Sequence, residues 1–205
     1  MAYMAYKIGI MGGTFNPIHI GHLIIAENAY EEYQLDKIWF MPSKRPPHKE
    51  NKEIVSENDR LKMIEMAIEN NSHFSLSTIE LERDGITYTI DTIKYLIDNF
   101  PENEYYFIIG ADSLFQLTSW NQAEELFKLV PFLVATRDEA SYKEMQSYAK
   151  ILADNYGTRI SFLTTPNIEI SSSMIRKKVQ QNKSISYFVP DCVQKYIVFH
   201  KLYEK

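Results

Sequence analysis

The chain has 205 residues, a net charge of −5 and a single cysteine, Cys192. This length suits one domain of ordinary to large size, and 45% hydrophobic residues argue against disorder. The lone cysteine excludes an internal disulfide and favours a reduced, cytoplasmic setting. An acidic chain is a poor binder of nucleic-acid backbones, and no apolar run approaches the roughly 18–20 residues of a membrane span. We therefore expect no nucleic acid and no membrane among its partners.

Strand-like and helix-like stretches alternate along the chain, which is the pattern of a parallel α/β sheet with helices on both faces. The expected elements follow from apolar spacing and from capping residues. In chain order they are strand Lys7–Met11, helix His19–Gln34, strand Lys37–Met41, an exposed loop 42–53, a helix from Ser56 to about Glu69, strand Phe74–Leu81, helix Thr89–Phe100, strand Tyr105–Ile109, short helices Ser113–Leu117 and Gln122–Leu129, strand Phe132–Ala135, helix Tyr142–Asn155, strand Ile160–Leu163, and helices Ser171–Gln181 and Pro190–His200. We predict a single domain over 1–205, with about 171–205 as a small C-terminal helical part.

The segment after the first expected strand reads Gly12-Gly13-Thr14-Phe15-Asn16-Pro17-Ile18-His19-Ile20-Gly21-His22. Glycines at the carboxyl edge of a parallel strand let a phosphate approach the backbone, and a following helix offers N–H groups with partial positive charge. Many strand–helix turns, however, need two glycines for geometry alone. His19 and His22 share one helical face, where two imidazoles can donate to phosphate oxygens, and Gly21 leaves room for a base or ribose.

Three other interpretations of the histidine pair stay open at this point. The pair could arise by chance on a helix. It could be part of a metal site, although no third or fourth ligand is evident nearby. It could cap the helix, although Thr14 or Asn16 would suit capping better than either histidine.

A second informative segment is Ile170-Ser171-Ser172-Ser173-Met174-Ile175-Arg176. Three hydroxyl groups at the start of a helix, beside its N–H groups, make a concentrated anion site. Arg176 can reach the same anion and keeps its charge at any working pH. The alternative is a serine-rich helix cap followed by an ordinary surface arginine.

His-Ile-Gly-His after a Gly-rich turn, combined with the Ser-rich element that ends in Ile-Arg, resembles the nucleotidyltransferase superfamily. Over essentially its whole length the sequence resembles bacterial nicotinate-nucleotide adenylyltransferases. The resemblance implies a Rossmann-like fold and transfer of AMP from ATP to nicotinate mononucleotide, with Mg²⁺ bound together with the ATP and no metal site made by the protein. It implies catalytic roles for His19, His22 and Arg176. The ATP contacts that it implies are Gly12, Gly13, Thr14, Phe15, Gly21, Gly110, Asp112, Ile170, Ser171, Ser172 and Ser173.

The resemblance also implies an acceptor site built from the middle of the chain. Trp120 would stack on the pyridine ring, since an indole face suits an electron-poor ring. Lys44 and His48, in the Pro-Pro-His loop, would close over the reacting groups, and Thr87 would offer its backbone N–H to a carboxylate. Asn16 and Arg137 complete the expected acceptor set. Two alternatives stand beside these roles, a core tryptophan and a solvated charged loop.

Two other functions remain as alternatives. One is adenylyl transfer to another phosphorylated acceptor, such as nicotinamide mononucleotide or phosphopantetheine. The other is a nucleotide-binding sensor without turnover, against which His19, His22 and Arg176 argue because a pure binder needs no transition-state donors. The sequence leaves open the preference between nicotinate and nicotinamide forms and whether the chain forms a homo-oligomer.

Overall fold

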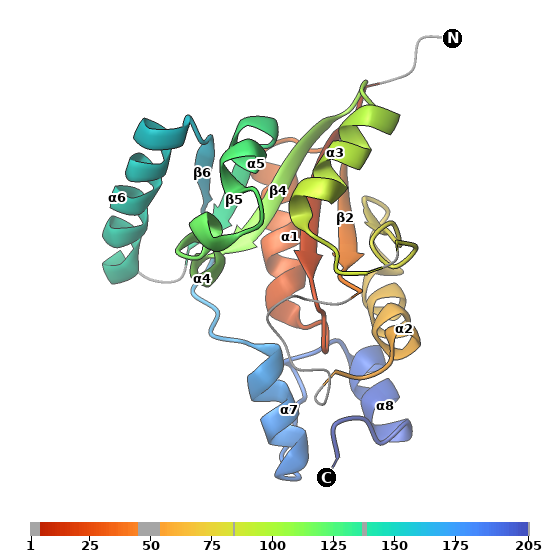
Figure 1. Ribbon diagram of the computed structural model, residues 1–205. Coiled ribbons are helices and arrows are strands. Elements are labelled where there is room, and N and C mark those ends of the chain that lie inside the picture. Colours follow the sequence, from red (N-terminus) through yellow and green to blue (C-terminus); the bar gives the residue numbers. More distant parts are fainter. Residues whose placement is uncertain (1–4, 45–53, 84, 137–138, 205) are drawn as a thin grey trace.

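The computed structural model describes residues 5–44, 54–83, 85–136 and 139–204, and its centre is a six-stranded sheet (Figure 1). The strands run in the order β3-β2-β1-β4-β5-β6, and each neighbouring pair is parallel. Their bounds are β1 Lys7–Gly13, β2 Lys37–Pro42, β3 Phe74–Leu76, β4 Glu104–Gly110, β5 Phe132–Ala135 and β6 Ile160–Leu163. The strand order reverses between β1 and β4, and a parallel sheet binds its ligands at the carboxyl ends of the strands beside such a point.

Helices cover both faces of the sheet, as the alternating pattern predicts. Two separate hydrophobic clusters hold them there, one with α1, α2, α7 and α8 and the other with α3, α5 and α6. The helices are α1 Ile20–Glu32, α2 Glu57–Ile68, α3 Thr89–Asn99, α4 Ala111–Leu114, the short 3-10 helix η2 Leu117–Ser119, α5 Ala123–Leu129, α6 Glu139–Tyr156, α7 Ser172–Gln180 and α8 Asp191–Phe199. Among the described residues, no helix is long and apolar enough to cross a membrane.

Strand β4 shows why the sequences of the central strands are apolar at nearly every position. Phe107 and Ile109 point into the cluster with α3 and α5, whereas Ile108 between them belongs to the cluster with α1 and α2. Successive side chains of a strand alternate between faces, so a strand covered on both sides needs apolar residues at every position.

The C-terminal helices lie beyond the ends of the central strands, below their arrowheads in Figure 1. Ile175 of α7 and Val193 and Ile197 of α8 are buried in the same cluster as α1 and α2. α8 also packs against α2. The C-terminal part therefore shares the core of the sheet domain, and we propose that residues 1–205 act as one domain.

Apart from shifts of one to three residues at the ends of other elements, three differences from the expected elements are informative. β3 ends at Leu76 instead of Leu81, because Ser77 makes the last ladder bond, to the carbonyl of Phe40 (2.9 Å), and the chain then turns at Thr78. β1 continues through Gly12 and Gly13, which pair with Met41 and Pro42 of β2. The helix expected over Ser113–Leu117 is instead α4, which begins directly at the end of β4, followed by η2.

Candidate active site

Residues from both sequence motifs meet at the carboxyl edge of the sheet. The first motif leaves the end of β1 and enters α1, and the second forms the start of α7. Because Gly12 and Gly13 are strand residues, the turn itself begins at Thr14. A Cβ at Gly12 would come within 2.9 Å of the Phe107 ring, so this glycine is required by packing inside the sheet.

His19 and His22 form a reciprocal cap at the start of α1. His19 is the N-cap, with an extended backbone (φ −146°, ψ 168°). Its Nδ1 accepts the backbone N–H of His22 at 3.4 Å, and the Nδ1 of His22 accepts the backbone N–H of His19 at 3.2 Å. The prediction that Thr14 or Asn16 would suit capping better is wrong, because the helix begins at Ile20. A histidine can cap because its Nδ1 lies as many bonds from Cα as the side-chain oxygen of asparagine.

The reciprocal cap also decides which ring nitrogen carries the proton. A ring nitrogen that accepts a hydrogen bond has no proton, so each neutral ring carries it on Nε2. His19 is only 6% exposed, and burial lowers its pKa to about 4. His19 is therefore uncharged at neutral pH. The two rings stack with centroids 3.6 Å apart, which sets two Nε2–H donors side by side.

Gly21 makes room for one of these rings. A Cβ at this position would lie 3.1 Å from Nδ1 and 3.2 Å from Cε1 of His19, and 3.8 Å from Cβ of Ile170. The glycine therefore serves the histidine pair directly. The expectation that it also leaves room for a base or ribose stays a prediction.

Helix α7 is hydrogen-bonded to the turn that precedes α1. The hydroxyl of Ser172 donates to the carbonyl of Pro17 at 2.8 Å, and Nη1 of Arg176 donates to the carbonyl of Asn16 at 3.0 Å. These pairs are 155 and 160 residues apart in the sequence. The two motifs therefore form one structure, as their joint occurrence predicts.

Many hydrogen-bonding groups of the two helix starts are engaged within the protein. Ser171 caps α7 by accepting the backbone N–H of Met174 at 3.2 Å. The first N–H of α1, that of Ile20, donates to the carbonyl of Phe188 at 3.0 Å, and the N–H of His22 is taken by His19. These three contacts occupy groups that the sequence suggests for anion binding, and the anion site itself stays a prediction.

The residues expected to bind the acceptor are only partly brought together. Lys44 follows β2, and its Nζ donates to the carbonyl of Arg83 at 2.8 Å, in the segment that leads to the buried Thr87. Trp120 is half-buried and packs edge-on against Phe107, with centroids 5.9 Å apart. His48 and Arg137 lie outside the described residues.

The structure buries Asn16 within the turn, and its expected contact with the acceptor stays a prediction. Its side chain is 2% exposed, and its Oδ1 accepts from the Tyr203 hydroxyl at 3.0 Å and from the Val55 N–H at 3.3 Å. The amide thus holds the C-terminal segment and the chain before α2 against the turn. Burial raises the pKa of Tyr203, and Asp59 adds to this rise while Arg176 and Arg60 oppose it.

The two remaining expected sites lie after β4. Gly110 is the last residue of β4, and a Cβ there would meet no other atom within 4 Å. Asp112 is exposed in the first turn of α4, with the backbone of Gly110 before it. Both therefore border open space at the same edge of the sheet as the histidines.

Arg60 is the important residue that the sequence analysis misses. It is 1% exposed, and its Nη1 donates to the carbonyls of Thr14 and Ser43, both at 2.9 Å. A signal was present in the sequence, because Arg60 shares a helical face with the apolar Met63 and Ile64. An arginine on the apolar face of a helix has to reach a buried acceptor.

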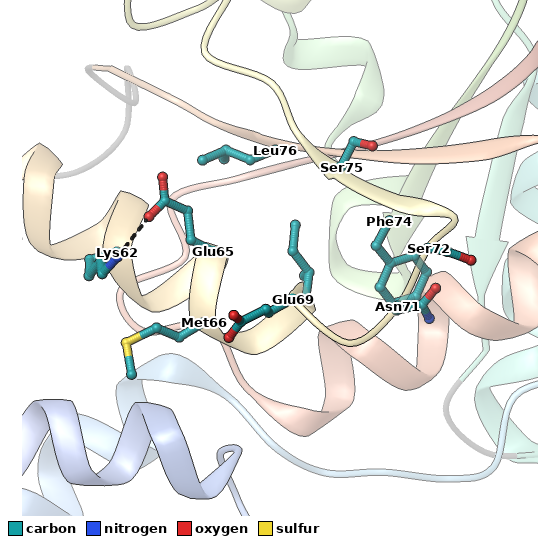
Figure 2. Close-up of a pocket in the computed structure, with 10 residues that line it drawn as sticks. Lys62, Glu65, Met66, Glu69, Asn71, Ser72, Phe74, Ser75 and Leu76 are labelled. Carbon is teal, nitrogen blue, oxygen red and sulfur yellow. Dashed lines mark hydrogen bonds and ion pairs between the residues drawn. The ribbon is translucent and has the colours of Figure 1, made fainter.

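A shallow hollow of about 600 Å³ lies between α2 and the outer side of β3 (Figure 2). In Figure 2, Lys62 and Glu65 meet there in an ion pair of 3.3 Å. No residue of the two motifs lines this hollow, so its size does not mark the site. Within the described part of the chain, no three His, Cys, Asp or Glu side chains are grouped to hold a metal ion.

Comparisons with known proteins agree with this geometry. A cytidylyltransferase-like family model matches residues 10–178. Proteins named as probable nicotinate-nucleotide adenylyltransferases are similar to the chain. The one from Lachnoclostridium phytofermentans is 46% identical over 96% of this chain and 98% of its own length, and the one from Bacillus pumilus is 39% identical over 97% and 98%.

The fold is also shared with solved structures. The Plasmodium falciparum nicotinic acid mononucleotide adenylyltransferase complexed with NaAD superposes with a TM-score of 0.82 at 23% identity, over 97% of both chains. The predicted Rossmann-like nucleotidyltransferase fold is therefore confirmed. On the identity and coverage of these relatives, the chain belongs to the nicotinate-nucleotide adenylyltransferase family.

Proposed function

We propose that this chain transfers AMP from ATP to nicotinate mononucleotide, giving deamido-NAD and pyrophosphate in NAD biosynthesis. The main support for the proposal is the pair of hydrogen bonds by which Ser172 and Arg176 join α7 to the turn before the histidine pair. This contact places a cationic side chain and two Nε2–H donors around one turn at the carboxyl edge of the sheet. The names of the relatives identify the acceptor, and the setting we propose is the cytoplasm.

In this reaction an oxygen of the acceptor phosphate bonds to the α-phosphorus of ATP. The bond from that phosphorus to the bridging oxygen breaks, and pyrophosphate leaves with the electron pair. The acceptor oxygen is already ionised, so the enzyme needs no general base and no covalent intermediate. Catalysis then consists of alignment and charge stabilisation. His19 and His22 would donate to phosphate oxygens, and Arg176 would offset the charge that develops on the departing pyrophosphate.

A divalent cation, Mg²⁺ in our proposal, would be bound together with the ATP. Mg²⁺ prefers phosphate oxygens and water as ligands, so in our proposal the triphosphate and water would hold it, without a set of protein side chains. When bound, the cation neutralises part of the triphosphate charge. The residues of the chain then have to orient the nucleotide.

Trp120 would select the acceptor by presenting its indole to the pyridine ring. We expect Trp120→Ala to raise KM for nicotinate mononucleotide by roughly fivefold and to leave KM for ATP nearly unchanged, because stacking of this kind contributes on the order of 1 kcal/mol. Trp120→Phe is the matched control, since it keeps a ring and should retain most of the affinity. Equal losses for both substrates would mean that Trp120 only supports the core around Phe107.

The decisive experiment is pyrophosphate release from ATP with a panel of acceptors. Nicotinate mononucleotide should give the highest kcat/KM. A preference for nicotinamide mononucleotide or phosphopantetheine would keep the chemistry and replace the acceptor. Binding of ATP without release from any acceptor would establish a sensor and refute the proposal.

A further inference from the structure

Arg60 joins the two chain segments that leave the sheet beside the site. Its Nη1 donates to the carbonyl of Thr14, just after β1, and to the carbonyl of Ser43, just after β2, both at 2.9 Å. These strands are neighbours, and Gly13 pairs with Pro42 at their ends. One guanidinium group therefore sets the position of one turn relative to the other.

Packing alone does not account for an arginine at this place. Arg60 is 1% exposed, it forms no ion pair with any described carboxylate, and no described group accepts from its Nε. Burial lowers the pKa of Arg60, an effect that nearby Glu57 opposes, and a guanidinium remains charged at neutral pH. Burying such a charge is costly, and methionine would fill a similar volume at lower cost. Only arginine, and not a methionine of similar volume, can donate the hydrogen bonds to the two carbonyl groups.

Each of these contacts orients a peptide group. In a planar trans peptide the N–H points opposite to the C=O, so the N–H of Phe15 and that of Lys44 point away from Arg60. A carbonyl that accepts from a cation also polarises its own peptide group, which makes the N–H a stronger donor. Phe15 has a φ of 48°, an uncommon conformation for a residue with a Cβ, so this turn has to be held by its contacts.

We infer that Arg60 is a positioning residue, which fixes the peptide groups Thr14–Phe15 and Ser43–Lys44 so that their N–H groups face the phosphates of ATP. The inference rests on the proposed function, because it takes ATP as the ligand of this turn. Arg60 itself is buried and does not contact the substrate. Its effect therefore passes entirely through the backbone of the two turns.

The test compares Arg60→Met, Arg60→Lys and a control, Lys62→Met. Lys62 lies on the same helix, and its side chain is 56% exposed. Each protein is titrated with a non-hydrolysable ATP analogue and Mg²⁺, and its melting temperature and turnover are measured. Arg60→Met should weaken analogue binding roughly 10- to 100-fold, the range for losing a hydrogen bond to a charged group. Arg60→Lys should recover part of the loss, because an ammonium group can reach one carbonyl, and Lys62→Met should bind like the wild type.

Analogue affinity and KM at wild-type values in folded Arg60→Met, with only a lower melting temperature, would overturn the inference. Where Arg60→Met does not fold, Arg60→Lys decides, since wild-type affinity in that variant also overturns it. Absence of analogue binding by the wild type would overturn it as well. Failure of the proposed function would give a different experimental result. The wild type would then bind the analogue but release no pyrophosphate with any acceptor, and the comparison of Arg60 variants would stand.

Discussion

In the proposed function, the histidine pair would combine helix capping and phosphate binding in the same side chains. The Nδ1 atoms cap α1 through bonds of 3.2 and 3.4 Å to backbone N–H groups. In the proposed reaction the Nε2–H groups would donate to the phosphate, so capping and catalysis would use different nitrogens of each ring. A substitution that preserves one side and removes the other can therefore separate the two tasks.

His22→Ala and His22→Asn make this separation. The alanine variant loses both nitrogens, so we expect kcat to fall by about 10²–10³ and the free energy of unfolding to fall by about 1 kcal/mol. The asparagine variant places its Oδ1 where Nδ1 lies in the histidine. It should therefore keep wild-type stability while its kcat falls as far as that of alanine. Pyrophosphate release and urea unfolding measure the two effects, and near-normal turnover in His22→Asn would contradict a role for the Nε2–H donor.

At the scale of elements, the contact of α7 with the turn before α1 organises the site. Ser172→Ala leaves the Pro17 carbonyl without its 2.8 Å hydroxyl donor. We expect the free energy of unfolding to fall by about 1 kcal/mol and KM for ATP to rise severalfold, because α7 is then held less firmly beside the histidines.

Two variants serve as controls for Ser172→Ala. Ser172→Thr restores the hydroxyl group and should recover the ATP affinity. Ser147→Ala removes a hydroxyl that bonds within α6, to the Lys143 carbonyl at 2.9 Å, and should leave KM unchanged. Urea unfolding and ATP titration of turnover provide the measurements. An unchanged KM for ATP in Ser172→Ala would show that the hydrogen bond of Arg176 is enough to hold α7 against the turn before α1.

Most of the elements were predictable from periodicity because the sheet is covered on both faces. The apolar runs of β4 and β5 and the helical spacing of α3 indicated their structures correctly. The error at β3 has a physical cause. Ser77 and Glu80 are buried after the last residue of β3, so the pattern of buried positions continues where the backbone is no longer a strand.

The contact between the two motifs was predictable from the sequence, whereas the residues that support them were not. His19, His22 and Arg176 stand out because their residue types and spacing suit a triphosphate. The cap formed by His19 depends on its backbone angles, which spacing does not reveal. Arg60 and Tyr203 act through contacts with residues 46 and 187 positions away, and a local pattern carries no information about such partners.

At the scale of the whole molecule, His19 makes stability depend on pH. Its pKa is about 4 in the folded protein and 6.5 ordinarily. Between these values the unfolded chain binds a proton that the folded chain does not, so the free energy of unfolding rises as pH increases from 4 to 6.5 and then levels off. Over this pH interval, the lowered pKa of His19 changes the free energy of unfolding by about 3 kcal/mol. Urea unfolding at a series of pH values measures it.

His19→Asn is the control for this pH dependence, because it keeps a cap acceptor and does not titrate. Its stability should change less than that of the wild type over the same pH interval, by about the 3 kcal/mol assigned to His19. The same slope in both proteins would mean that other groups dominate the acid response.

The separation of 155 and 160 residues between the partners of the α7 contacts has a consequence for the order of folding. Contacts between distant parts of a chain are slow to form because their loop-closure entropy must be overcome first. In the proposed site, a molecule that has folded only its N-terminal half would carry His19 and His22 without Arg176 and would bind ATP weakly. ATP would therefore bind selectively to completely folded molecules, and by mass action it would add about 2.7 kcal/mol to their stability at a hundredfold excess over Kd. On the proposed function, the substrate would thus favour the completely folded molecule over partly folded ones.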